Sequence, residues 1–208
     1  MVHLVQVRSD ALRNKRRILE SARELVGTRG VGVPMDDIAL RAGVAVGTLY
    51  HHFPAKADLI DAVIDDGIAH IADLAESMLA AVQDGAEITK QVAALFAATV
   101  ERHATDHAFK AAVGVLELPS VDYLESSPLA TSRGRAVRAI TALLDKARAA
   151  GTVRSDLTFA DFVMLIGAAP TAQPAPMRQR YVDIVLAGLM TAAAYAAYSR
   201  SGCPVGSP

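Results

Sequence analysis

The sequence predicts an all-α protein, and three observations support this: abundant alanine, few aromatic residues, and apolar residues at helical spacing. Alanine, the strongest helix former, accounts for 40 of the 208 residues. Aromatic residues make up only 5% of the chain and Trp is missing, which disfavours a β-sandwich or a barrel. With 52% apolar and 21% charged residues, the chain can bury a substantial core and does not have the composition of a disordered protein.

Apolar periodicity, interrupted by Pro and Gly, predicts where the helices lie. We expect helices at about residues 10–28, 35–42, 46–53, 56–82, 87–104, 107–118, 130–149, 159–169 and 177–199. A long irregular link is expected at 119–129, and the residues after Tyr198 are expected to be disordered. The chain is therefore a run of short helices followed by a set of longer ones.

The two ends of the chain differ in charge. Residues 1–56 contain nine Lys or Arg and five Asp or Glu, a balance of +4, whereas residues 57–208 contain 12 basic and 17 acidic residues, a balance of −5. A basic end on an acidic remainder indicates that this end meets a polyanion. In the acidic part, Asp61, Asp65 and Asp66 are expected to form a solvated face and not a metal cluster.

Cysteine content and hydropathy predict a cytoplasmic protein. The single Cys203 excludes a framework of internal disulfides and favours a reducing compartment. The first ten residues lack the pattern of a signal peptide, and the longest uncharged run, 184–199, is shorter than the roughly 20 residues that span a membrane. No membrane segment is expected.

The sequence gives no sign of an enzyme. The G-x-S-x-G, P-loop, H-E-x-x-H and C-x-x-C motifs are all missing, as is the alternation of strands and helices typical of nucleotide-binding folds. His103 and His107 have the spacing that can chelate a metal on a helix, but we expect the helix to break near His107. No cofactor and no metal site are therefore expected.

Residues 38–59 have the pattern of a helix-turn-helix motif. One short helix ends at Gly43, and a second begins three residues later, with the glycine in the turn. At about 100° per residue, three side chains of the second helix face the core: Ala45, Leu49 and Phe53. Four residues face outward: Gly47, Thr48, Tyr50 and His51.

The outward residues have the chemistry of a nucleic-acid contact. Gly47 allows the backbone to approach a phosphate closely, and the hydroxyl groups of Thr48 and Tyr50 can donate hydrogen bonds. His51 can donate to a phosphate or to a base edge, and Lys56 begins the next helix, where unpaired N–H groups favour an anion. Each of these residues taken singly could be an ordinary surface residue. Their combined spacing favours binding to DNA.

The segment around this motif resembles the DNA-binding domain of the TetR/AcrR family of bacterial transcriptional regulators. The resemblance spans about residues 10–70 and is most specific in the run AGVAVGTLYHHFPAK. The matching residues are Ile18, Ala22, Gly30, Asp37, Ile38, Ala39, Ala42, Gly43, Val44, Gly47, Thr48, Leu49, Tyr50, His52, Phe53, Lys56 and Leu59. The resemblance implies phosphate contacts from three residues: Thr48, Tyr50 and Lys56. It also implies base-edge contacts from Val46 and His51.

The sequence departs from the family pattern at three places. Many relatives have Ser or Thr where this chain has Val33-Pro34, and Ser is common at the positions of Ala45 and Ala55. Each difference removes a hydroxyl group that could cap a helix, worth about 1 kcal/mol, or contact a phosphate. These differences concern particular phosphate contacts and leave the class of protein unchanged.

The resemblance implies an all-helical domain for effector binding and dimerisation after the DNA-binding domain. We expect the DNA-binding domain at 10–56, with the recognition helix at about 46–53, the second domain at 57–200, and a disordered tail at 201–208. Eight residues are candidates for lining an effector pocket: Phe96, Val100, His103, Phe109, Val113, Leu116, Leu143 and Met164. The alternative is that these residues form plain core.

The last two predicted helices are candidates for a dimer interface. Residues 162–169 and 184–197 are uncharged and rich in small or apolar side chains, which suits pairing of two helices with their copies. The alternative is that both helices pack within one subunit.

These expectations combine into a ligand-responsive repressor. We expect it to bind a near-palindromic operator in double-stranded DNA as a homodimer and to be released by a small, mainly apolar effector. Two alternatives stay open: an architectural DNA-binding protein without an effector, and a helical small-molecule-binding protein or enzyme whose N-terminal motif is a relic. Footprinting on a single palindrome would separate the first alternative from the repressor, and a gel shift on genomic fragments would test the second.

Overall fold

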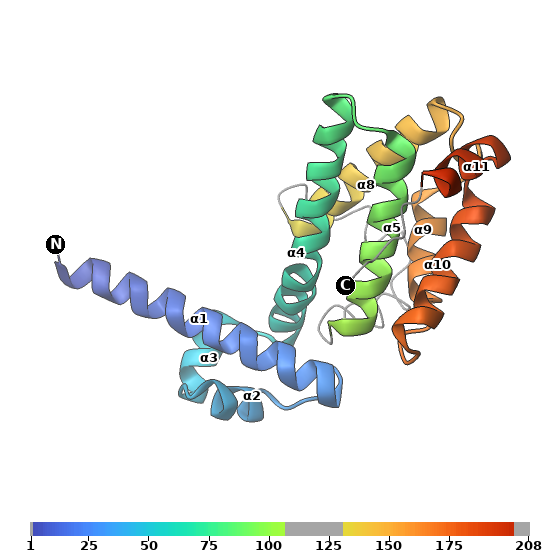
Figure 1. Cartoon of the computed structure of the whole chain (residues 1–208). Coiled ribbons are helices and arrows are strands. Elements are labelled where there is room, and N and C mark those ends of the chain that lie inside the picture. Colours follow the sequence, from blue (N-terminus) through green and yellow to red (C-terminus); the bar gives the residue numbers. More distant parts are fainter. Residues whose placement is uncertain (1, 107–130, 202–208) are drawn as a thin grey trace.

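The structure is a computed structural model that describes residues 2–106 and 131–201, with side chains described from Asp10 onward. The helices of these ranges are α1 Val2–Arg29, α2 Met35–Ala42, α3 Val46–His52, α4 Lys56–Gln83, α5 Ile88–Thr105, α8 Ser132–Ala149, α9 Phe159–Gly167, α10 Ala175–Leu189 and α11 Ala192–Arg200 (Figure 1). The described residues form no strand beyond an isolated bridge between Val153 and Met190. The all-α prediction is confirmed.

The predicted helix bounds agree closely with the structure, except at the two ends of the chain. Helix α1 begins at Val2 and not at residue 10, because residues 2–9 contain no Pro or Gly that would stop a helix. At the other end, α11 continues to Arg200, so the residues just after Tyr198 are helical and not disordered. The helix predicted at 107–118, the link at 119–129 and most of the predicted tail lie outside the described residues.

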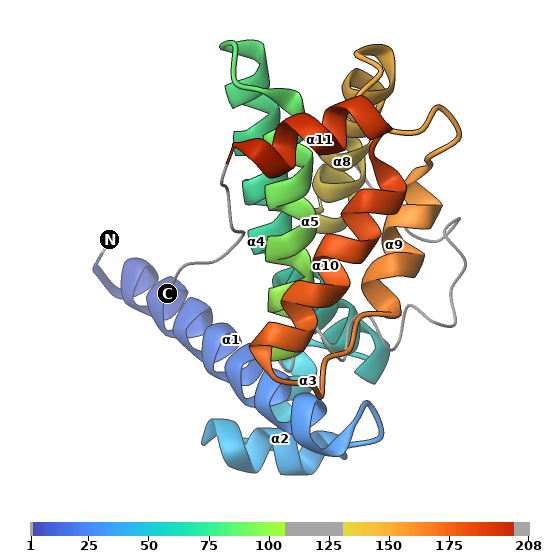
Figure 2. The ribbon, with the colours of Figure 1, turned by 45° about the vertical axis from the view of Figure 1, so that its right-hand side comes forward.

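The long helix predicted at 177–199 is two helices, α10 and α11. Met190 and Thr191 have extended backbones, with ψ of 153° and 152°, which ends one helix before the next begins. The loop after α8 holds this break open, because Arg154 N donates to Leu189 O at 2.9 Å and Thr191 N donates to Thr152 O at 3.1 Å. This loop comes from some 40 residues earlier in the chain, and no Pro or Gly in 189–192 signals the break. Figure 2 shows α11 turning away from α10 across the end of the bundle.

The N-terminal part, called the head here (residues 10–63), has a core of its own. Helices α1, α2 and α3 pack together with the first two turns of α4 (Figure 1). The buried members of this core are Ile18, Ala22, Val26, Val33, Met35, Ile38, Ala39, Ala42, Leu49, Phe53, Leu59 and Val63. The core therefore extends past residue 56, where the sequence predicted a domain boundary, because Leu59 and Val63 share one face of α4.

The rest of the described chain, called the body here (residues 64–106 and 131–201), surrounds a second core. Helix α4 runs from the head into the body, α8 packs along it, and α5 lies between α4 and the pair α9–α10 (Figures 1 and 2). Phe96 of α5 is fully buried at the centre. Adjacent residues of α4, Val63 and Ile64, belong to different cores. One continuous helix thus connects the two regions.

Asp61 and Asp66 are exposed, as the predicted solvated face implies, but Asp61, Asp65 and Asp66 also contact arginines of other helices. Asp65 accepts hydrogen bonds from the backbone N–H groups of Ser132 and Arg133 at 3.2 and 3.1 Å, and so caps the start of α8. The buried Arg133 side chain also lies 3.5 Å from Asp61. These contacts fasten α8 to the part of α4 nearest the head.

Candidate nucleic-acid interface and effector region

The turn between α2 and α3 depends on Gly43. Its φ of 62° is a left-handed conformation that suits glycine, and the turn closes with hydrogen bonds from Gly43 N to Leu40 O and from Val44 N to Ala39 O. Arg17 of α1 donates to the carbonyl of Gly43 at 3.3 Å. The glycine that the sequence placed in the turn therefore sets the angle between the two helices of the motif.

Helix α3 is anchored by its inner face. Leu49 is fully buried and Phe53 is 4% exposed, as the helical spacing predicted. The prediction that Ala45 faces the core is wrong: Ala45 is exposed, because it precedes the helix with an extended backbone and does not follow helical periodicity. The residues that precede α2, α3 and α4, Pro34, Ala45 and Ala55, have no side chain that caps a helix, and at α4 the Asp58 carboxylate instead accepts a hydrogen bond from Ala55 N at 2.9 Å.

The outer face of α3 is open to solvent. Val46 and Tyr50 are 40% and 45% exposed, Gly47 and His51 are exposed, and Thr48 is half-buried. Within the described part of the chain, no hydrogen bond or ion pair uses the side chain of Thr48, Tyr50 or Lys56. All six predicted DNA-contact residues therefore lie at or beside one short helix, five on α3 and Lys56 at the start of α4.

Charges flank this face. Lys15 of α1 lies 5.8 Å from the ring centre of Phe53, and Arg13 and Arg16 are exposed on the same helix. Burial lowers the pKa of His52, and the nearby His51 and Lys15 lower it further. His52 is thus held toward its neutral form between the core and the positive side chains.

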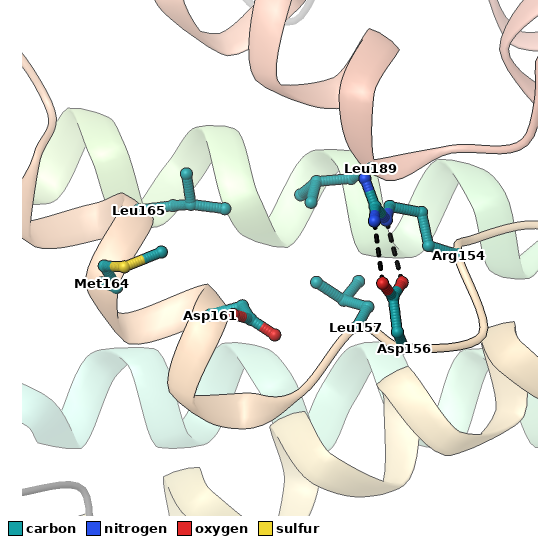
Figure 3. Close-up of a pocket in the computed structure, with 7 residues that line it drawn as sticks. All are labelled: Arg154, Asp156, Leu157, Asp161, Met164, Leu165 and Leu189. Carbon is teal, nitrogen blue, oxygen red and sulfur yellow. Dashed lines mark hydrogen bonds and ion pairs between the residues drawn. The ribbon is translucent and has the colours of Figure 1, made fainter.

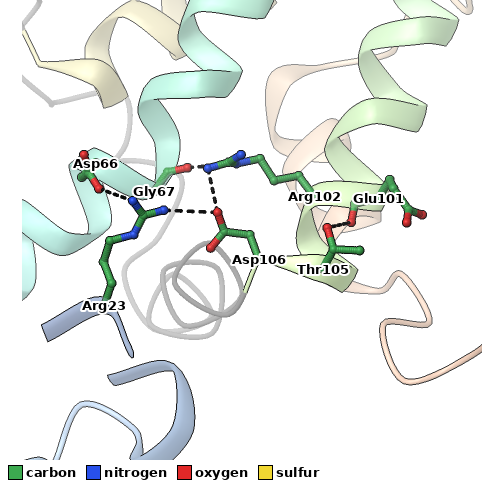
Figure 4. Close-up of polar contacts among 7 residues, drawn as sticks. All are labelled: Arg23, Asp66, Gly67, Glu101, Arg102, Thr105 and Asp106. Carbon is green, nitrogen blue, oxygen red and sulfur yellow. Dashed lines mark hydrogen bonds and ion pairs between the residues drawn. The ribbon is translucent and has the colours of Figure 1, made fainter. Parts of the chain in front are cut away.

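Four charged side chains join the head to the body at one junction (Figure 4). Arg23 of α1 lies 2.8 Å from Asp66 of α4 and 3.3 Å from Asp106, which follows α5. Arg102 of α5 lies 2.7 Å from the same Asp106 and donates to the carbonyl of Gly67 at 3.4 Å. Sequence reasoning missed this junction, because Arg23 and Asp106 are 83 residues apart and no local spacing relates them.

The predicted pocket residues that the structure describes are mostly core. Phe96, Val100 and Leu143 are at most 1% exposed, and the ring of Phe96 meets those of Phe162 and Tyr181 at centroid distances of 5.7 and 6.5 Å. Phe109, Val113 and Leu116 lie outside the described residues. The other two predicted pocket residues are His103 and Met164.

His103 and Met164 have different surroundings. His103 is 5% exposed, and its Nδ1 lies within hydrogen-bonding distance, 2.8 Å, of the carbonyl oxygen of Ile166. That Met164 and Leu143 close an effector site stays a prediction; Leu143 is fully buried, whereas Met164 is 63% exposed. The reason is that Met164 stands two residues from both Phe162 and Ile166, which face the core, and therefore points to the opposite side of α9.

Met164 instead lines an open cleft of about 330 Å³ at the edge of α9 (Figure 3). The other lining residues are Arg154, Asp156, Leu157, Asp161, Leu165 and Leu189. Arg154 binds Asp156 through two hydrogen bonds of 2.8 Å, which lowers the pKa of Asp156 to about 2. Asp161 accepts hydrogen bonds from Thr158 N and Thr158 Oγ1 at the start of α9. Both carboxylates are committed to local structure, so the cleft does not present a catalytic pair.

Helices α9 and α10, which lie next to each other in the body (Figure 2), expose large apolar side chains. Met164 is 63%, Met177 55% and Ile184 57% exposed, whereas the opposite faces of both helices are buried. Tyr181 ties the two helices together by donating to Leu165 O at 2.5 Å, and burial raises its pKa. The α9–α10 face, as we call it, is thus a firmly held apolar surface.

Comparisons with known proteins agree with this geometry. The model of the tetR family of bacterial regulatory proteins matches residues 18–63, and that of the C-terminal domain of SbtR-like transcriptional regulators matches residues 89–191. A TetR transcription regulatory protein from Mycobacterium vanbaalenii is 34% identical, with 89% of this chain and 99% of that chain covered and a TM-score of 0.55. The chain belongs to the TetR family. It thus shares with that protein both the helix-turn-helix head and the helical body.

Other relatives of this TetR-family protein match a shorter part of it or have lower identity. An HTH-type transcriptional regulator of Staphylococcus aureus is 44% identical over 59 residues, which is 28% of this chain. The chain therefore spans about a third (32%) of the length of the curated relatives it matches. CprB from Streptomyces coelicolor, solved in complex with its operator sequence, has the same fold, with 20% identity, a TM-score of 0.65, and 91% and 94% of the two chains covered. In the described part of the chain, none of the helices is both long enough and apolar enough to cross a membrane.

Proposed function

We propose that this protein is a ligand-responsive transcriptional repressor that binds a near-palindromic operator as a homodimer. One observation carries the DNA-binding part: the solvent-exposed face of α3 holds polar side chains without partners among the described residues, on a helix fixed by the buried Leu49 and Phe53. A rigid helix with an open polar face suits the major groove of DNA. The fold that this chain shares with CprB, which was solved on its operator, supports the same assignment.

The residues around α3 divide into two roles. Thr48, Tyr50 and Lys56 donate to phosphates and hold the helix at its position along the duplex, and Gly47 leaves room for the backbone to come close. Val46 and His51 reach base edges and provide sequence preference. The exposed Lys15 and Arg16 add to the attraction of this end for DNA.

The α9–α10 face forms the dimer interface in this proposal. Exposed Met164, Met177 and Ile184 have no cover within the described chain, and an apolar surface of this kind favours a permanent partner. The predicted interface included residues 184–197 as part of one helix. Because that helix ends at Leu189, we place the interface on α9 and α10 and not on α11. Two copies joined there present two recognition helices, and a near-palindromic site matches that two-fold symmetry.

The effector is a small, mainly apolar molecule held in the body. His103 is buried on α5, the helix that also carries the buried Phe96 and Val100, and is a polar group able to orient a ligand. Helix α4 carries Lys56 at one end and packs against α8 in the body, while the Arg23 junction fixes α1 to α5. An effector that shifts α4 or α5 therefore changes the placement of the head. Coupling of this kind is reciprocal and typically amounts to about 1–3 kcal/mol.

A DNA-binding experiment tests the first half of the proposal. Genomic fragments retained by the protein are sequenced, and affinity for the selected site is measured at several salt concentrations. Lys56→Ala should weaken binding to all sequences alike and lower the salt slope by about one, whereas His51→Ala should cost about 1–3 kcal/mol on the selected site only. Tyr50→Phe removes one hydroxyl group and isolates that phosphate contact.

Matched controls come from the body. Lys146→Ala and His70→Ala replace exposed residues of α8 and α4 far from α3, and should leave affinity and salt slope unchanged. Equal binding to all sequences would favour the architectural alternative. Full operator affinity in both Lys56→Ala and His51→Ala would overturn the assignment of α3.

The effector half is tested by a thermal-shift screen of small apolar molecules, followed by a gel shift with each ligand that raises the melting temperature. Release of the operator by such a ligand, and weaker ligand binding in the presence of operator, are the expected results. A ligand that stabilises the protein while operator affinity stays constant would contradict the coupling.

A further inference from the structure

The exposed face of α3 lacks the side chains that usually recognise guanine, adenine or cytosine. The helix, VGTLYHH, contains no Arg, Lys, Asn, Gln, Asp or Glu. Paired hydrogen bonds from Arg or Lys to guanine, from Asn or Gln to adenine, and from cytosine to Asp or Glu are therefore not possible from this helix. The base contact that stays open to an aliphatic side chain is the 5-methyl group of thymine.

Val46 is the aliphatic residue in position for this contact. It is the first residue of α3, and the N-terminal residues of a recognition helix are those that reach base edges. Its side chain is 40% exposed and does not take part in the apolar core of the head. Gly47 beside it has open space where a Cβ would stand, so a base can approach the backbone of α3 next to Val46.

We infer that Val46 packs against the 5-methyl group of a thymine in each half of the operator, and that this contact is a main determinant of the protein's sequence preference. The inference rests on the proposed DNA binding and specifies what α3 recognises. Removing one buried methyl group costs about 0.8 kcal/mol, which is about a fourfold loss of affinity per half-site and about fifteen-fold when both half-sites are changed.

The test replaces each thymine of the selected operator, one position at a time and in both half-sites, by deoxyuridine, which lacks only the methyl group. Affinity of the full-length protein is measured by fluorescence anisotropy. At one position the substitution should weaken the wild-type protein about fifteen-fold. Val46→Ala should bind the normal operator more weakly and should lose most of this sensitivity to deoxyuridine, because the group that meets the methyl is gone.

Val31→Ala is the matched control. Val31 lies in the turn between α1 and α2 and is 42% exposed, nearly the same as Val46, but it is not on α3. This variant should keep the wild-type affinity and the wild-type response to deoxyuridine. Thermal melting of both variants checks that the head stays folded.

The outcomes separate this inference from the function on which it rests. If the operator is bound specifically but no thymine position responds to deoxyuridine, or if Val46→Ala responds as strongly as the wild type, the thymine contact is refuted and the regulator assignment stands. If the protein shows no sequence preference on any DNA, the proposed function itself fails.

Discussion

The head and the body both expose apolar carbon, but in different settings. On α3, Val46 and Tyr50 stand among hydroxyl and imidazole groups, so this face is stable in water and can also meet a polyanion. On α9 and α10, three large apolar side chains, Met164, Met177 and Ile184, are more than half exposed, and Arg180 is the charged side chain exposed on the same stripe of α10 as Met177 and Ile184. The face of α3 suits a transient partner, and the α9–α10 face suits a permanent one.

The two regions also differ in how they are held. The face of α3 is fixed by neighbours in the sequence: Gly43 before it, Leu49 within it and Phe53 after it. The body is fixed by contacts between distant segments, such as Asp65 with the start of α8 and Arg154 with Leu189. Changes in the head should therefore act locally, whereas changes in the body should spread.

The largest effect is expected from Ile184→Arg, which puts a charge on the α9–α10 face. If this face is the dimer interface, an unpaired buried charge should dissociate the dimer, and operator affinity should fall by a factor of about 10²–10⁴ because the two heads no longer act together. Sedimentation gives the mass, and anisotropy the affinity. Leu40→Arg, on an 83% exposed residue of the head, should leave the mass unchanged. A dimer that survives Ile184→Arg would place the interface elsewhere.

The second effect concerns the core of the body. Phe96→Ala should lower the free energy of unfolding by about 3–5 kcal/mol, because it opens a cavity beside Phe162 and Tyr181. Leu49→Ala in the head should cost about 2–5 kcal/mol by the same mechanism. Chemical denaturation followed by circular dichroism measures both.

Phe96→Ala and Leu49→Ala also test whether the head and the body unfold in one transition. Because α4 belongs to both cores, each variant should shift a single transition. Two separate transitions would show that the head and the body are independent. Met164→Ala, on an exposed residue of α9, should have little effect on the transition measured at low protein concentration, where subunits are apart.

A smaller effect is expected at the junction between the regions. Arg23→Met removes the partner of Asp66 and Asp106, and should reduce stability by about 1 kcal/mol since these groups are only partly buried. Its main consequence should be weaker coupling: an effector should release the operator less completely from this variant. Arg29→Met, which breaks an ion pair with Asp37 inside the head, should leave the coupling intact. Equal release from the two variants would exclude the junction as a coupling element.

The smallest effect is a dependence of stability on pH. Burial keeps the pKa of His52 in the folded protein below 6.5, its ordinary value, so the unfolded chain takes up a proton first as the pH falls. Stability should therefore decline as the pH drops through 6.5 toward the lower pKa of the folded state, and should be unaffected above it. His52→Gln should reduce this decline in Tm between pH 7.5 and 5.5, which thermal unfolding at the two pH values measures. An identical decline in His52→Gln would contradict this explanation.

The sequence alone was enough to predict the fold class, the helix-turn-helix motif and the outward face of α3. All of these depend on residues within one or two helical turns, where spacing fixes direction: Leu49 and Phe53 turn inward, so Tyr50 and His51 turn outward. Family membership was also predictable, because the run from Ala42 to Lys56 is specific. Ala45 was misplaced since periodicity was extended one residue beyond the start of the helix.

Tertiary structure alone decided the features that depend on distant residues. The break at Met190 is held by the loop at 151–154, the acids of α4 pair with Arg23 and Arg133, and Met164 is exposed because Phe162 and Ile166 take the inner face of α9. For the break and the ion pairs no local pattern exists, because their partners are some 35 to 70 residues away and meet only when the helices pack, whereas the direction of Met164 follows from the spacing of α9 itself. Helical periodicity reports the direction of a side chain on its own helix, and packing determines what that side chain meets.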